Sequence, residues 1–163
     1  MERWPMKLEA VVYILMMLFL AFMLEHLPMP ELISWFQPAW VMLIVTVMVL
    51  FAPSAFGLWL AIPLGLMLDA EHGTPLGLHI ILVALHIYLL QLLYRRIYLF
   101  NVAQQSAVLF LMIMAEQIIH YWAVAVLYEE ATPVMLFAPA ITTAILWPWL
   151  YVVGYRSLKR LEM

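Results

Sequence analysis

The chain has 163 residues, of which 68% are hydrophobic and only 10% are charged, and its mean hydropathy is +1.04. Soluble domains carry about 25% charged residues, and a small one buries only about two-thirds of the surface that its chain exposes. This composition excludes a soluble enzyme, a disordered regulator and a nucleic-acid-binding protein. The sequence has no cysteine, which excludes disulfides and cysteine-ligated metals, and its net charge of −3 gives no basic field for nucleic acid.

The apolar runs predict an all-α bundle of six transmembrane helices that comprises residues 1–163 as one integral membrane domain. A span needs about 20 residues, and the expected spans are about 8–24, 36–52, 55–69, 76–94, 106–127 and 134–153. No charge occurs from residue 39 to residue 68. A single helix there would be about 45 Å long and would overshoot the bilayer. We therefore place a break at Pro53, where a proline interrupts helical hydrogen bonding.

The basic residues predict the orientation of the chain. With six spans and a cytoplasmic amino terminus, every basic residue falls on the cytoplasmic side, as the positive-inside rule favours. With five spans, some of them lie outside. The seven residues are Arg3, Lys7, Arg95, Arg96, Arg156, Lys159 and Arg160. We expect both termini in the cytoplasm, and we expect the last three basic residues to hold the tail against anionic lipid.

One glutamate and three histidines lie well inside the expected fourth and fifth spans, where such groups are costly. Glu116 and His120 are four residues apart and share a helix face, whereas His79 and His86 are two turns apart on the preceding span. A proton or cation relay is one reading, and a metal site is another. Polar pairing between packed helices is more common. No HExxH motif occurs, so we expect neither a bound metal nor any other cofactor.

The stretch GLMLDAEHGTPLG, residues 65–77, predicts a tight turn between the third and fourth spans. Gly73 and Gly77 permit unusual backbone angles, and Asp69 is suited to cap a helix or to bind the amides of the turn. We expect structural roles for these three residues and for Pro38, which opens the second span. No GxSxG or Walker-type motif occurs, so no catalytic residue is expected.

Several segments together resemble the MreD family of bacterial rod shape-determining proteins over essentially the whole chain. They are LPMPEL (27–32), WFQPAWVMLI (35–44), the glycine-containing turn (65–77) and LWPW (146–149) before a basic tail. Glu116 also stands where the family is expected to have an acidic residue. The resemblance implies a non-enzymatic inner-membrane protein of the cell-elongation machinery, which supports rod shape and lateral peptidoglycan synthesis.

The resemblance also implies partners. The nearest is MreC, bound through its transmembrane helix, within a complex that holds MreB, RodZ, RodA and the elongation-specific transpeptidase, and that allows a homodimer. With no room for an extramembrane domain, the chain has to act through helix faces. We expect the last two spans to bind MreC through Glu116, His120, Trp147, Pro148 and Trp149. Pro148 bends its helix, and the two tryptophans suit either a membrane interface or a docking surface.

Two other functions remain open at this point. The family is similar in topology to the substrate-binding subunits of ECF transporters, but a shared fold does not transfer a ligand. Such a subunit would need an outward pocket with converging polar groups. The other function is a proton-conducting or ion-conducting subunit that uses Glu116 and the histidines.

Overall fold

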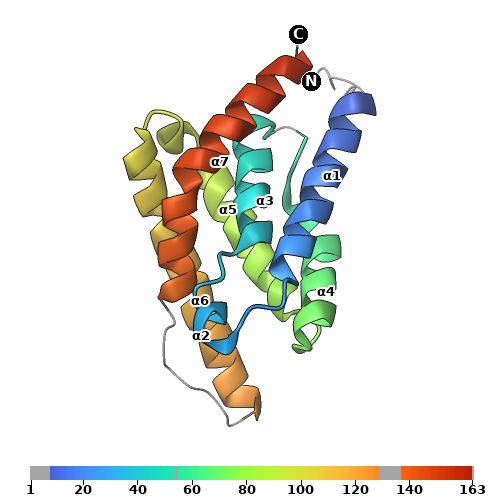
Figure 1. The fold of residues 1–163 in the computed structure, drawn as a ribbon, viewed down its shortest axis with the longest axis vertical. Helices are drawn as coiled ribbons and strands as arrows, with labels where there is room; N and C mark the ends of the chain where they lie inside the picture. The colour runs from blue at the N-terminus through green and yellow to red at the C-terminus, as the bar shows by residue number, and fades with distance from the viewer. Residues whose placement is uncertain (1–7, 54, 129–136, 163) are drawn as a thin grey trace.

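The computed structural model describes residues 8–53, 55–128 and 137–162, and these residues are all-α (Figure 1). The six principal helices are joined by one short helix and one 3-10 turn. In chain order, the elements are α1 (Leu8–Glu25), α2 (Glu31–Ser34), α3 (Trp40–Phe51), the 3-10 turn Leu58–Leu60, α4 (Ala61–His72), α5 (Leu78–Ile97), α6 (Val102–Tyr128) and α7 (Ala138–Glu162).

The six principal helices follow the order of the six expected spans, with shifted ends. α3 begins at Trp40 rather than at residue 36, because residues 35–36 form a turn and residues 37–39 are not helical. Residues 55–57 are not helical, and α4 follows one turn of 3-10 helix. α7 continues to Glu162 instead of ending at residue 153, whereas residues 134–136 of the expected last span lie outside the described residues.

Length and composition make α5 and most of α6 suitable for crossing a membrane. Shorter apolar helical stretches occur at Ile14–Glu25, Trp40–Phe51 and Ala138–Gly154. These apolar helices agree with the expected membrane location by length and composition, while the six individual crossings and their orientation stay predictions. A helix of 12 residues, such as α3, is about 18 Å long, so α3 alone is shorter than the hydrocarbon core.

The centre of the bundle is α3, whose residues from Val41 to Leu50 are all buried. A helix that is apolar on every side is typical of such a central position. α1, α5 and α7 pack against it, α4 packs on α5, and α6 packs between α5 and α7 (Figure 1). The core is therefore built around one short helix that α1, α5 and α7 contact directly.

The helix ends fall into two groups (Figure 1). The start of α1, the α5–α6 turn and the end of α7 lie at the upper end in the figure, whereas the α4–α5 turn and α2 lie at the lower end. Arg95 and Arg96 are exposed in the last turn of α5, at the upper end. The side chains of Arg156, Lys159 and Arg160 lie outside the described part of the chain, although their backbone continues α7 at that same end.

Candidate functional site

A buried polar network connects the three helices α3, α5 and α6. The ring of His86 lies between two partners: its Nε2 is 2.8 Å from Thr46 Oγ1, and its Nδ1 is 2.6 Å from Glu116 Oε1. The Thr46 hydroxyl also lies 2.7 Å from the carbonyl oxygen of Met42, one turn earlier on α3. Thr46 and His86 are 0% exposed and Glu116 is 4% exposed. The polar groups therefore satisfy one another inside the protein, as buried polar groups must.

A second polar cluster closes the α4–α5 turn around the carboxylate of Asp69, which is 1% exposed. It accepts hydrogen bonds from the amides of Gly77 (2.6 Å) and His79 (2.9 Å) and from the Thr74 hydroxyl (2.9 Å). The His79 ring nitrogen Nδ1 lies 2.8 Å from the same carboxylate. Asp69 thus binds amides at the start of α5, which have no partners within the helix.

The two glycines of this turn adopt the left-handed conformation that side chains disfavour. Gly73 has φ of 63° and ends α4, and Gly77 has φ of 106° and precedes α5. Together with Asp69 they form a compact connection between the two helices. Pro38, the fourth residue given a structural role from the sequence, is buried two positions before α3.

Three histidine rings lie in a row at this same end of the bundle. The rings of His72 and His79 are stacked with centroids 5.0 Å apart, and the rings of His79 and His120 are 5.3 Å apart. They come from α4, α5 and α6 respectively. Within the described residues, no three His, Asp or Glu side chains have an arrangement that suits a metal ion. The row is thus a set of ring contacts between helices.

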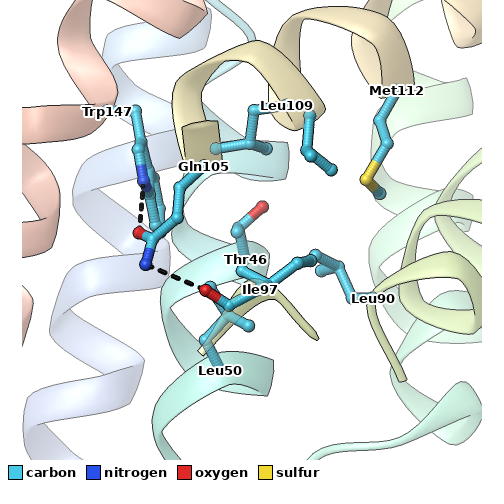
Figure 2. A pocket seen from close by; sticks show the side chains of 9 residues that line it. Thr46, Leu50, Leu90, Ile97, Gln105, Leu109, Met112 and Trp147 are labelled. Carbon is cyan, nitrogen blue, oxygen red and sulfur yellow. Dashed lines mark hydrogen bonds between the residues drawn. The ribbon is translucent and has the colours of Figure 1, made fainter. Parts of the chain in front are cut away.

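A third polar contact lies towards the α5–α6 turn, beyond the Thr46 network (Figure 2). The indole Nε1 of Trp147 donates to Gln105 Oε1 at 3.0 Å, and Gln105 Nε2 donates to the carbonyls of Ile97 and Phe100. The side chains between this contact and Thr46 are apolar, and the gap that they leave cannot admit a water molecule. These apolar side chains are those of Leu50, Leu90, Val108, Leu109 and Met112.

The structure does not gather the five expected partner-binding residues on one surface. Glu116 faces α5 and its His86, and Trp147 is 0% exposed, so both point into the chain's own core. His120 is half-buried against His79, and Pro148 is half-buried within α7. Trp149 alone of the five is strongly exposed, at 76%. The reading of Trp147 as a surface anchor is wrong, because it packs inward and donates to Gln105.

Three buried polar residues were not identified from the sequence. Thr46 is the only hydroxyl-bearing residue between Pro38 and Pro53, and a lone hydroxyl in such an apolar segment is a signal that could have identified it. Gln105 lies in the first turn of α6, one position before the expected fifth span, and no role was predicted for it. A third, Thr143, is fully buried on α7, and its hydroxyl accepts a hydrogen bond from the Ala39 amide at 3.0 Å.

Comparison with known proteins identifies the family. A sequence model described as rod shape-determining protein MreD matches residues 6–155. The rod shape-determining protein MreD of Haemophilus influenzae is 24% identical over 144 residues, which cover 88% of this chain and 89% of that protein. No solved structure matches. Because the family match extends over nearly the entire chain, we conclude that the chain belongs to the MreD family, whose members are non-enzymatic inner-membrane proteins that determine rod shape.

Proposed function

We propose that this chain is a membrane scaffold of the cell-elongation complex and that it binds the transmembrane helix of MreC on the outer face of α7. Membership of the family implies an association with the rod complex. The supporting observation is an apolar stripe on α7 that no other described helix covers. It consists of Ile141, Ile145, Trp149 and Val152, which are 45%, 65%, 76% and 44% exposed.

The stripe has the geometry of a helix-packing face. Its members are spaced by four, four and three residues, so they follow one side of the helix. The opposite side of α7 carries Thr143 and Trp147, which are fully buried against the rest of the bundle. In lipid, association of helices depends on close packing and on hydrogen bonds between helices, because the hydrocarbon tails are as apolar as the side chains. An uninterrupted apolar stripe on α7 offers a surface for close packing.

Pro148 supplies a further reason to favour α7. Proline has no amide hydrogen, so the carbonyl of Ala144, four residues earlier, loses its normal helical donor. Within a membrane such a carbonyl is satisfied by a neighbouring helix, by a side chain or by water. Ala144 is also small and only partly buried, which permits the close approach of another backbone. We infer that the MreC helix crosses α7 near Ala144 and Trp149.

Co-purification with MreC tests this proposal. Trp149→Ala should reduce the yield of MreC recovered with the tagged chain at least fivefold, because it removes the largest side chain of the stripe. Trp59→Ala is a matched control, since Trp59 is 60% exposed before α4, on another part of the molecule. Equal recovery of MreC with both variants would rule out the α7 face.

The two other candidate functions, a small-molecule-binding subunit and an ion-conducting subunit, have less support. An ECF-type subunit needs a pocket with polar groups, whereas the interior space between Thr46 and Trp147 is lined mostly by apolar side chains and admits no water (Figure 2). Ion conduction would need polar groups through the whole bundle, but this dry layer interrupts them. We also propose that MreB, RodZ, RodA and the transpeptidase join through MreC, with Arg95 and Arg96 available on the cytoplasmic side.

A further inference from the structure

We propose that Thr46, His86 and Glu116 form a proton-binding site that holds one proton within the membrane-embedded bundle, and that the contact between α3, α5 and α6 is stable only while this proton is bound. The inference does not depend on the binding of MreC. It follows from counting hydrogen-bond donors and acceptors in the buried network.

The count begins at the Met42 carbonyl, which can only accept a hydrogen bond. The Thr46 hydroxyl lies 2.7 Å from it and therefore donates its single hydrogen there. The Thr46 oxygen is then an acceptor for His86 Nε2, 2.8 Å away, so that nitrogen carries a hydrogen. On the other side of the ring, His86 Nδ1 and Glu116 Oε1 are 2.6 Å apart. One further hydrogen has to lie between these two atoms.

That hydrogen can belong to either group, and both arrangements are electrically neutral. A neutral imidazole can accept from a protonated carboxyl group, or an imidazolium can donate to a carboxylate. Either way the pair holds one proton more than a neutral histidine beside an ionised glutamate. Loss of this proton would leave an uncompensated negative charge among residues that are at most 4% exposed, which is strongly unfavourable in such surroundings.

The other titratable groups lie mainly towards the α4–α5 end. His120 is one turn from Glu116 on α6, and His79 is two turns from His86 on α5. α4 contributes Asp69, Glu71 and His72 near these histidines. α3 and α7 contribute no charged side chain near the network among the described residues, and the layer beyond Thr46 is dry. α1, which packs on α3, contributes Glu25, whose carboxylate accepts a hydrogen bond from the Val41 amide.

Nitrogen-15 NMR of histidine-labelled protein in nanodiscs at pH 7 tests the protonation directly, without any substitution in the network. The expected spectrum shows His86 Nε2 bearing a hydrogen, with Nδ1 hydrogen-bonded to Glu116. Assignment uses a His86→Gln sample, in which that signal is absent. A spectrum with a bare Nε2 and a hydrogen on Nδ1 would overturn the proposal, because the network would then carry the negative charge of an ionised Glu116.

The pH dependence of unfolding provides the second test. The unfolded chain releases the proton above about pH 6.5, where free histidine is neutral and glutamate ionised. If the native state keeps it, the ratio of folded to unfolded protein falls by up to tenfold per pH unit above that value. In Glu116→Gln, the amide can donate to Nδ1 and leaves Nε2–H on Thr46, so this fall should disappear. Glu71→Gln is the control: it should keep the fall above pH 7.5, with a change only near pH 7, because Glu71 contributes to the raised pKa of Glu25, which is about 7.

The measurement is reversible SDS-induced unfolding between pH 6.5 and 8.5, with the difference between wild type and Glu116→Gln taken at each pH. A difference that grows with pH supports the site. Equal slopes for the two proteins would show that no proton is retained and would overturn the proposal. If Glu116→Gln did not fold at all, a neutral amide would have failed to replace the protonated pair, and that result also counts against it.

Discussion

Gly65 lies where α4 and α5 approach each other most closely, so Gly65→Ala should weaken the bundle. A Cβ atom at this position would lie 2.4 Å from both the N and Cα atoms of Ile80 and 2.8 Å from the carbonyl carbon of His79. Ordinary contacts of this kind are 3.4–4 Å. Because all three atoms belong to the backbone, no side-chain rotation relieves the clash, and the helices would have to separate by about 1 Å.

Overpacking of this kind lowers the free energy of unfolding by about 1–3 kcal/mol, and we expect a clash against backbone to fall at the upper end of this range. Alanine recovers about 1 kcal/mol through its better helix propensity. We therefore expect the free energy of unfolding to fall by about 2 kcal/mol, which is about a thirtyfold change in the folding equilibrium. The separation would also lengthen the hydrogen bonds from Gly77 and His79 to Asp69, which are now 2.6 and 2.9 Å.

Reversible SDS unfolding in mixed micelles, followed by circular dichroism, measures this loss. Two other glycines give a graded comparison. In Gly154→Ala the only close contact of the new atom is with the Val47 side chain at 2.8 Å, which can move, so about 1 kcal/mol is expected. Gly57→Ala meets nothing closer than 3.5 Å and should change stability by less than about 0.5 kcal/mol. A Gly65→Ala protein as stable as Gly57→Ala would refute this account of the α4–α5 contact.

Two further substitutions probe the polar contacts by the same unfolding assay. Asp69→Asn should cost about 2–3 kcal/mol, because one amide oxygen cannot accept all the hydrogen bonds that the carboxylate accepts; an unchanged midpoint would contradict this role. Trp147→Ala should cost about 3–5 kcal/mol, since it removes a fully buried ring and the donor to Gln105, whereas Trp149→Ala should stay within about 0.5 kcal/mol. Similar losses for the two tryptophan variants would contradict the inward placement of Trp147.

The sequence predicts the helices well, because long apolar runs interrupted by proline, glycine and charge carry strong local signals. The break near Pro53 separates α3 from α4. Helix ends are predicted less accurately: Trp40 begins α3 four positions later than expected, since Gln37 and Ala39 before it form hydrogen bonds to α1 and α7. Such tertiary contacts leave no periodic pattern in a segment where nearly every residue is apolar.

The partners of single polar side chains could not be predicted from the sequence for the same reason. Helical spacing placed Glu116 with His120 and His79 with His86, and each pair does share a side of its helix. Spacing along one helix cannot show which neighbouring helix that side meets. The pairing of Glu116 with His86 and the third partner, Thr46, depend on how α3, α5 and α6 pack. Trp147 was misread for that reason, since its partner Gln105 is 42 positions away.

The distribution of these contacts along the chain has a consequence for biogenesis. α4 and α5 are consecutive, and Asp69 and Gly65 join them locally, so this hairpin can form as soon as both helices have left the insertion machinery. His86 arrives with α5, but its carboxyl partner is 30 residues further along on α6. Until α6 has been synthesised, the ring of His86 therefore lacks its second hydrogen-bond partner, Glu116. We expect the nascent chain to stay close to the insertion machinery until Glu116 emerges and completes the network.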